Sequence, residues 1–206
     1  MTDLHIRTRP LGRVLVTGGA GFIGSAISHS MLDADDVVAF DNLHPQIHAS
    51  GTRPAELHKN VELIPGDVTS AEDWDRVLDR IRPDTLIHLA AETGTGQSLT
   101  ESTRHANVNV VGTTQMLDAL LRHDVLPERI VLTSSRAVYG EGAWVGRENH
   151  ISYPGQRSVQ QLEAGQWDFP ELEPVPMKAA EVHPNPVSVY AATKLTQEHL
   201  VRVWAE

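Results

Sequence analysis

The sequence predicts an α/β fold, in which a doubly wound parallel sheet is covered by helices in three layers. Up to residue 140, short β-rich runs alternate with helix-like segments, an order typical of right-handed strand–helix–strand crossovers. The strands are nearly continuous apolar runs, as expected when helices cover both faces of the sheet. The chain has 206 residues, 40% of them apolar, which is enough to bury a sizeable core.

The alternation gives an expected position for each element. The predicted strands lie at 13–16, 36–40, 61–64, 85–89 and 130–133, and the predicted helices at 22–32, 71–81, about 99–123, and 190–204. Ser70 precedes Glu72 and Asp73, which is typical of a capped helix with acid in its first turn. We interpret residues 1–206 as a single domain.

The stretch from 141 to 188 differs in composition from the rest of the chain. Six of the twelve prolines lie between Pro154 and Pro186, and the stretch as a whole contains the aromatic residues Trp144, Trp167 and Phe169. Long loops of this kind are often functional. We therefore expect a partly ordered insertion after the fifth strand, and a loose surface insertion is the alternative.

The composition excludes several classes of protein. There is no cysteine, so a disulfide framework, a zinc–thiolate site and a cysteine nucleophile are excluded. Seventeen basic and 27 acidic residues give a net charge of −10, unlike the basic surface of a nucleic-acid binder. The longest apolar run is four residues, far short of a membrane span, and the start does not resemble a secretory signal. We expect a cytoplasmic protein without nucleic-acid or membrane partners.

A glycine-rich turn, Thr17 to Gly24, lies between the first strand and the first helix. Gly18 permits the tight turn, Gly21 lets a pyrophosphate approach the backbone, and Gly24 lets the helix pack closely on the strand. The free amides at a helix N-terminus also favour phosphate. This strand–turn–helix setting predicts a dinucleotide site, and a purely structural turn is the alternative.

Further candidates for cofactor contacts follow the next strands. The second strand ends at Asp41, where a carboxylate can accept hydrogen bonds from both ribose hydroxyls of NAD and would repel the 2′-phosphate of NADP. We therefore predict NAD as the cofactor. Asp67, after the third strand, could accept from the adenine amino group or cap the next helix. The small residues in Leu89–Ala91 leave room for a cofactor. Tight helix–sheet packing is the alternative explanation, and it is compatible with that role.

Candidate catalytic residues lie in the last third of the chain. Tyr190 and Lys194 are four residues apart and share one helical face. A nearby ammonium group stabilises a phenolate, so the tyrosine can exchange a proton with a substrate hydroxyl near neutral pH. Ser134 and Ser135 end the fifth strand, at the sheet edge where ligands bind. A serine there can bond the same reacting oxygen, and strand-end capping is the alternative for both.

Together these strings resemble the extended short-chain dehydrogenase/reductase family, the NAD-dependent sugar-nucleotide epimerases and dehydratases. The resemblance runs from about residue 12 to 206 and implies a Rossmann-type fold. It implies that Tyr190 is the catalytic base and acid, that Lys194 binds the nicotinamide ribose and tunes Tyr190, and that Ser135 is their hydroxyl partner. Tyr190 and Ser135 would contact the substrate.

The resemblance also assigns the remaining cofactor contacts. Asn109, in an Asn-x-x-Gly-Thr string, would hold the central helix near the active site. The other residues implied to line the cofactor are Phe22, Ile23, Asn42, Leu43, Val68, Leu89, Ala90, Ala91 and Thr93. A homodimer is implied as well, formed through a four-helix bundle of the central helix and the Tyr190 helix.

Two features narrow the implied reaction. The 4,6-dehydratases of this family carry Asp-Glu directly after the catalytic hydroxyl residue, whereas Arg136 and Ala137 stand here, so the acid/base pair for elimination is missing. The turn from Glu92 to Ser98 and the string from Tyr153 to Ser158 look like the dTDP-L-rhamnose 4-epimerase-like branch. The implied activity is epimerisation of a nucleotide-activated sugar through a transient 4-keto intermediate, in nucleotide-sugar and cell-surface polysaccharide metabolism.

Two other functions stay open. One is a sugar-nucleotide dehydrogenase or reductase that releases reduced cofactor, and the other is a non-catalytic, NAD-responsive binding protein. Relatives continue with a substrate-binding lobe, whereas Lys194 lies twelve residues from the end of this chain. We therefore expect the C-terminal substrate-binding domain to be absent and the 206-residue chain alone to be an inactive fragment.

The histidines are not expected to bind metal. His44 and His48 have the i, i+4 spacing of a metal pair, but Pro45 between them disfavours the helix that this spacing needs. His88 lies in an apolar strand and is interpreted as a hydrogen-bonded core residue.

Overall fold

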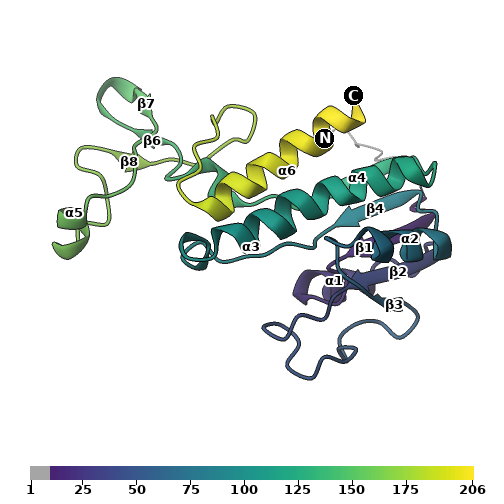
Figure 1. Cartoon of the computed structure of the whole chain (residues 1–206). Coiled ribbons are helices and arrows are strands. Elements are labelled where there is room, and N and C mark those ends of the chain that lie inside the picture. The colour runs from purple at the N-terminus through teal and green to yellow at the C-terminus, as the bar shows by residue number, and fades with distance from the viewer. Residues whose placement is uncertain (1–9) are drawn as a thin grey trace.

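The computed structural model describes residues 10–206, and its main feature is a five-stranded parallel sheet (Figure 1). The strands are β1 (Arg13–Thr17), β2 (Asp36–Asp41), β3 (Glu62–Pro65), β4 (Thr85–His88) and β5 (Arg129–Leu132), in the order β3-β2-β1-β4-β5. All neighbouring pairs are parallel. This confirms the predicted Rossmann-type sheet. The strand order reverses between β1 and β4, which is where such sheets bind ligands.

Helices cover both faces of the sheet, as predicted. α1 (Phe22–Ser28) lies on one face, and α2 (Ala71–Arg80), α4 (Gly112–Arg122) and α6 (Val189–Ala205) lie on the other. Successive strand residues point to opposite faces. The core beneath α2, α4 and α6 contains Leu15, Val38, Phe40, Leu86, Trp74 and Met116, and the core beneath α1 contains Val14, Val16, Val37, Ala39 and Met31.

Helix ends follow local hydrogen bonding. Ser70 caps α2 as predicted, because its side chain accepts a bond from the Asp73 amide at 3.2 Å. α1 ends at Ser28, before the predicted end at residue 32. The Ser28 hydroxyl donates to the Ser25 carbonyl at 2.6 Å and accepts from the His58 amide at 3.0 Å. Serine side chains that bond backbone groups in this way compete with helix continuation.

The long helix predicted at about 99–123 is present from 102 to 122, but it is not a regular α-helix throughout. A 3₁₀ turn at Gln97–Leu99 precedes α3 (Ser102–Ala106), and a π-helical turn at Asn107–Val111 joins α3 to α4. π turns inside α-helices are frequent at functional sites. Asn109 lies within this turn and is completely buried.

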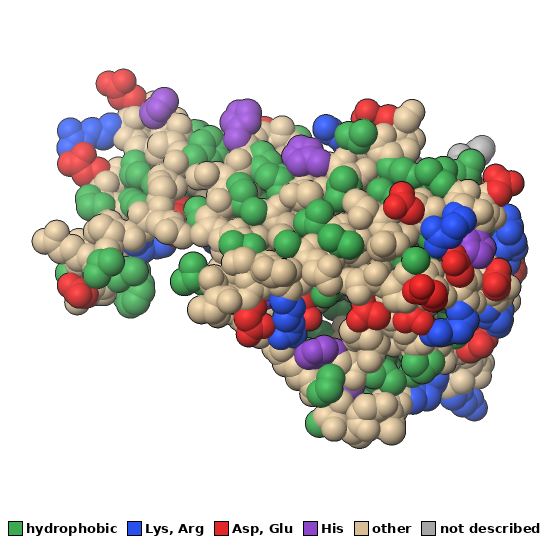
Figure 2. Space-filling view, in the orientation of Figure 1, with side chains coloured by type: hydrophobic (Ala, Val, Ile, Leu, Met, Phe, Trp, Pro, Cys, Tyr) green, Lys and Arg blue, Asp and Glu red, His purple; other side chains and the backbone are tan. Residues whose placement is uncertain are grey.

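The insertion at 141–188 projects from the body of the molecule (Figures 1 and 2). Its three short strands, β6 (Trp144–Val145), β7 (Ile151–Ser152) and β8 (Glu173–Pro174), form an antiparallel sheet in the order β7-β6-β8, and α5 (Val159–Glu163) lies between β7 and β8 in the chain. The rings of Trp144 and Phe169 pack edge to face with centroids 5.0 Å apart. The insertion thus has secondary structure and a small aromatic contact of its own.

The surface over α2 and the end of α4 mixes acidic and basic side chains (Figure 2). Arg80 pairs with Asp36 at 2.8 Å and with Glu62 at 2.6 Å. Exposed pairs of this kind contribute little to stability. Within residues 10–206, no helix is both long enough and apolar enough to cross a membrane.

Candidate active site

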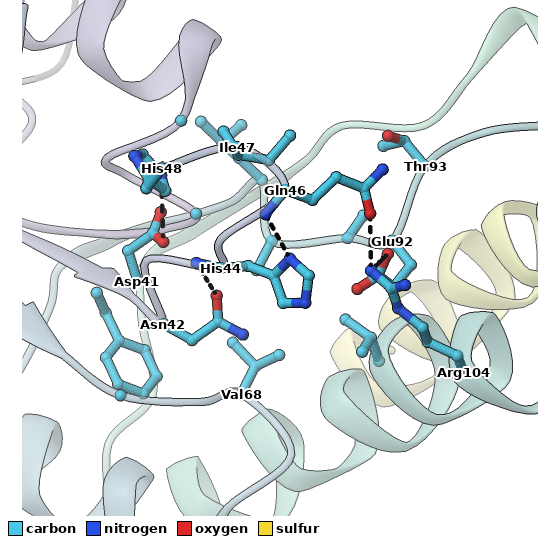
Figure 3. A pocket seen from close by; sticks show the side chains of 18 residues that line it. Asp41, Asn42, His44, Gln46, Ile47, His48, Val68, Glu92, Thr93 and Arg104 are labelled. Carbon is cyan, nitrogen blue, oxygen red and sulfur yellow. Dashed lines mark hydrogen bonds and ion pairs between the residues drawn. The ribbon is translucent and has the colours of Figure 1, made fainter. Parts of the chain in front are cut away.

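A pocket of about 160 Å³ opens where β1, β2 and β4 end (Figure 3). Its walls come from the glycine turn, the loops after β2 and β3, the turn after β4, α3 and the π turn that follows it. This is the carboxyl edge of the sheet beside the reversal of strand order, where a parallel α/β sheet binds ligands. The pocket brings together nine of the predicted cofactor-binding residues, namely Gly18, Gly21, Asp41, Asn42, Val68, Leu89, Ala90, Ala91 and Thr93.

The glycine turn has the geometry that a dinucleotide site needs. Gly18 has a positive φ of 65°, and a Cβ atom there would lie 2.7 Å from the Ala90 amide nitrogen. A Cβ atom on Gly24 would lie 2.5 Å from the Gly19 carbonyl oxygen. On Gly21 it would meet only the Gly18 carbonyl oxygen, at 3.2 Å. Gly18 and Gly24 are therefore required by packing, whereas Gly21 lines the pocket and has open space beside its Cα atom. A contact of Gly21 with a diphosphate stays a prediction.

Asp41 is fixed at the pocket edge by two backbone amides. Its Oδ2 accepts from Ala20 at 3.0 Å, and its Oδ1 accepts from Leu43 at 2.8 Å. The ring Nε2 of His48 lies 3.8 Å from Oδ1. These contacts orient the carboxylate and still leave each oxygen with acceptor capacity. The predicted role of Asp41 toward a ribose therefore fits the structure.

Asp67 lies near the pocket but does not line it. Its Oδ1 accepts from the amide and hydroxyl of Thr69, and its Oδ2 accepts from the Asn42 side chain at 3.0 Å. Burial raises the pKa of Asp67, but these hydrogen bonds outweigh that effect, so its pKa lies below the ordinary value. Ser70, and not Asp67, caps α2. A contact of Asp67 with adenine stays a prediction.

Several other predicted residues lie outside the pocket lining. Phe22 and Ile23, in the first turn of α1, are 90% and 52% exposed, and Gly24 is packed against Gly19. The full set of predicted cofactor residues that the pocket does not include is Phe22, Ile23, Gly24, Leu43, Asp67, Asn109, Tyr190 and Lys194.

Sequence reasoning missed one wall of the pocket. Arg104 of α3 pairs with Glu92 at 2.9 Å and with Glu101 at 2.8 Å. It also donates to Gln46 Oε1 at 3.1 Å, from the opposite side of the pocket (Figure 3). No glycine pattern or spacing rule marks a loop residue such as Gln46.

Among residues 10–206, no group of three or more His, Cys, Asp or Glu side chains could hold a metal ion.

The helix α6 carries both Tyr190 and Lys194. Ser188 caps it by accepting from the Ala191 amide at 3.1 Å. Lys194 is only 2% exposed, and its Nζ donates to Gln197 Oε1 at 2.6 Å. Burial lowers the pKa of Lys194 to about 8, while the nearby Glu198 carboxylate acts in the opposite direction. The predicted pair is therefore present on one helix, with its lysine inside the protein.

Asn109 joins α6 to the pocket. Its Nδ2 donates to the Thr193 hydroxyl at 2.9 Å and to the Glu92 carbonyl at 3.0 Å, and its Oδ1 accepts from the Glu92 amide at 2.8 Å. Glu92 lines the pocket. Asn109 thus connects the central helix to α6 and to the pocket wall, and its role near an active site stays a prediction.

Tyr190 lies in the first turn of α6, and Ser135 directly precedes a short turn that packs against α6. The Tyr190 ring packs edge to face against His105, with centroids 6.3 Å apart. His105 in turn bonds the carbonyl oxygen of Thr93, a pocket-lining residue, at 3.3 Å. Ser135 Oγ accepts from the Ala137 amide at 3.1 Å and caps the short turn after β5, a turn that packs against α6. Its contact with a substrate stays a prediction.

Comparison with known proteins relates this geometry to relatives. The chain is 55% identical over all 206 residues to the dTDP-L-rhamnose 4-epimerase of Burkholderia thailandensis, of which it covers 57%. It is 31% identical over 203 residues to a UDP-glucose 4-epimerase of Azospirillum brasilense, of which it covers 46%. The crystal structure of UDP-glucose 4-epimerase from Thermus thermophilus in complex with NAD matches 93% of the chain with a TM-score of 0.65 and 28% identity, and 50% of that structure is covered.

The chain spans about half the length of the curated relatives it matches. A family profile matches residues 14–160, which include the glycine turn, Asp41, Asn109 and Ser135. This chain belongs to the NAD dependent epimerase/dehydratase family.

Proposed function

We propose that this chain provides, in a single domain, the cofactor site and the catalytic residues of an NAD-dependent nucleotide-sugar epimerase. The observation that carries the proposal is the link between α6 and the pocket, in which Asn109 bonds both Thr193 and Glu92. This link supports a position of the Tyr190 and Lys194 helix close to the bound cofactor. The 55% identity to a dTDP-L-rhamnose 4-epimerase supports the same reaction class.

The pocket residues divide the cofactor among them. The diphosphate would lie against the turn from Gly18 to Gly21, a ribose would bond Asp41, and Lys194 would reach the second ribose. Bound NAD supplies a reversible two-electron oxidation at C4 of the sugar. Asp41 and the glycine turn bind and orient the cofactor. Residues of the 89–93 turn line the pocket and limit the access of water to the bound cofactor.

The proton chemistry belongs to Tyr190. Its phenolate accepts the proton of the 4-hydroxyl as the sugar becomes a 4-keto species, and returns it when the carbonyl is reduced on its other face. Lys194 is predominantly protonated at neutral pH, since its pKa is about 8, and its positive charge favours the phenolate. Ser135 donates a hydrogen bond to the same sugar oxygen. No cofactor is consumed over the cycle.

The test is product analysis with a panel of nucleotide sugars, dTDP-L-rhamnose first. The protein, extended to the length of its relatives, is incubated with NAD and each sugar, and the sugar ring is followed by NMR. We expect the 4-epimer without accumulation of NADH. Tyr190→Phe should remove activity by several orders of magnitude, whereas Tyr153→Phe, an exposed hydroxyl in the insertion, should not.

The alternatives give different outcomes. Steady NADH production from one nucleotide sugar would favour a dehydrogenase or reductase. Intact NAD binding and unchanged biological function in Tyr190→Phe would favour a non-catalytic binding protein.

Cofactor selectivity is a separate prediction. We expect NAD to bind at least about tenfold more tightly than NADP, because the Asp41 carboxylate repels a 2′-phosphate. Asp41→Asn should narrow the difference, measured by fluorescence titration. Asp36→Asn, at the opposite end of β2 and paired with Arg80, is the control that should leave it unchanged. Equal affinity of the wild type for both cofactors would contradict this role of Asp41.

We further propose a cytoplasmic homodimer that associates through the central helix and α6. Exposed apolar side chains on these helices, Val111, Leu121 and Val203, support such a surface. Sedimentation equilibrium should give the mass of a dimer, and Leu121→Glu should shift the distribution toward monomer. A wild-type monomer at high concentration would rule out this interface.

A further inference from the structure

We propose that Gln197 is a positioning residue that holds the ammonium group of Lys194, and that a buried chain of hydrogen bonds fixes Gln197 in turn. This inference rests on the proposed function, in which Lys194 assists Tyr190. Gln197 lies one helical turn after Lys194 and is completely buried. Its Oε1 lies 2.6 Å from Nζ and is the one hydrogen-bond acceptor for that ammonium in the part of the chain that the structure describes.

The orientation of the Gln197 amide follows from Thr113. The Thr113 hydroxyl donates its hydrogen to the Asn109 carbonyl oxygen at 2.6 Å. It therefore can only accept from Gln197 Nε2, which lies 2.8 Å away. If the amide were reversed, its NH₂ group would face the Lys194 ammonium, and its oxygen would face the Thr113 hydroxyl, whose hydrogen is already donated to Asn109. The hydrogen-bond inventory thus leaves Oε1 facing Lys194.

His88 completes the chain. Its Nε2 lies 3.2 Å from Thr113 Oγ1, and because the threonine hydrogen is already used, Nε2 must donate. Its Nδ1 then accepts from the Thr17 hydroxyl at 2.6 Å. Burial, together with the positive charge of Lys194, lowers the pKa of His88 to about 3, so the ring is neutral, as this arrangement requires. The predicted core role of His88 is confirmed.

The chain ends in the pocket wall. Thr17 Oγ1 accepts from the amide of Ala90 at 3.3 Å, and Ala90 lines the pocket. One continuous path therefore runs from Ala90 through Thr17, His88, Thr113 and Gln197 to Lys194. Since every polar group on it has a fixed direction, Gln197 has a single orientation in which to present its oxygen to the lysine.

Loss of that oxygen has a measurable consequence. The glutamine oxygen stabilises the buried ammonium relative to the neutral amine, so without it the pKa of Lys194 falls. A carboxylate at the same position stabilises the charge, so the pKa rises. Less protonated lysine at neutral pH means less support for the Tyr190 phenolate.

The experiment follows the lysine side chains by NMR without NAD or sugar. The chain has three lysines, Lys59, Lys178 and Lys194, so selective ¹³C labelling gives three signals to titrate. We expect a pKa of about 8 for Lys194 in the wild type. This pKa should be lower by about 1 or more in Gln197→Met and higher than in the wild type in Gln197→Glu. Ser28→Ala removes buried hydrogen bonds at the end of α1 and serves as the matched control.

Thr113→Val tests the same chain if Gln197→Met does not fold. It keeps the glutamine but removes its anchor, so the pKa of Lys194 should fall by a smaller amount. An unchanged Lys194 titration in the Gln197 variants, or an equal change in Ser28→Ala, would overturn the proposal. Because no substrate is involved, the positioning role can be upheld even if the nucleotide-sugar assay fails, in which case only the proposed function falls.

Discussion

The five-stranded sheet and the 141–188 insertion keep their shapes by different means. In the sheet, central side chains such as Leu15, Val38 and Leu86 have no exposed surface, because α2, α4 and α6 cover the face on which they lie. In the insertion, every strand is two residues long, and most side chains are exposed. The sheet therefore positions the pocket through burial of apolar volume, which tolerates little change.

The insertion depends instead on a few directed contacts. Arg157 lies over the Phe169 ring, 4.9 Å from its centroid, and pairs with Glu141 at 2.6 Å. Phe169 itself packs against Trp144. A segment built this way can change shape locally without disturbing the core, because few of its side chains are shared with the sheet. The difference leads to predictions that compare matched changes in the two regions.

The largest effect is expected when a methyl group is added to the glycine turn. Gly18→Ala combines a left-handed backbone with a Cβ atom 2.7 Å from the Ala90 amide nitrogen, so the free energy of unfolding should fall by about 3 kcal/mol or more. Gly155→Ala in the insertion meets nothing within 4 Å and should change it by about 0.5 kcal/mol or less. Urea unfolding followed by circular dichroism measures both, and similar losses would erase the distinction.

A smaller effect is expected from the buried lysine, and it depends on pH. The pKa of Lys194 is about 8 in the folded chain against 10.5 for an ordinary lysine. Between these values the unfolded chain binds more protons, so stability rises with pH across this window, by at most about 3 kcal/mol.

Lys194→Met should remove this rise, whereas Lys178→Met, in an exposed pair with Glu181 of the insertion, should keep it. Unfolding free energies measured from neutral pH to above pH 10 provide the comparison. A rise of the same size in Lys194→Met would show that another group causes it.

The contrast also explains what the sequence could predict. The strands were predictable because their apolar runs are local and continuous. Gly18 and Asp41 could be assigned as well, because Gly18 directly follows β1 and Asp41 is the last residue of β2. The pocket wall formed by Gln46 and Arg104 was not predictable from the sequence, because these residues are 58 positions apart and meet only in the folded chain. Nothing in the helix pattern marks either one.

The central helix shows the same limit. Asn109 could be singled out by resemblance, but the π turn around it could not be predicted, since its side chain is held by Glu92 and Thr193 from other elements. The bond between Gln197 and Thr113 joins residues 84 positions apart. Spacing rules place Tyr190 and Lys194 on one helix, but they do not identify the contacts that hold the lysine side chain in place.

The smallest effect on global stability is expected from Phe169→Ala in the insertion. Phe169 belongs to neither core cluster of the sheet, so the free energy of global unfolding and the affinity for NAD should change by about 0.5 kcal/mol or less. Locally, Trp144 loses its aromatic neighbour and the Arg157 guanidinium loses the ring beneath it.

Local opening of the insertion should therefore become more frequent, and trypsin should cut after Arg147 and Arg157 several times faster than in the wild type. Leu162→Ala, on the exposed side of α5, is the control that should leave the cleavage rate unchanged. Mass spectrometry of the fragments gives the rate at each arginine. If Phe169→Ala lowered global stability as much as Gly18→Ala, the insertion and the sheet would form one cooperative unit, because only shared packing could pass so large a loss from one region to the other.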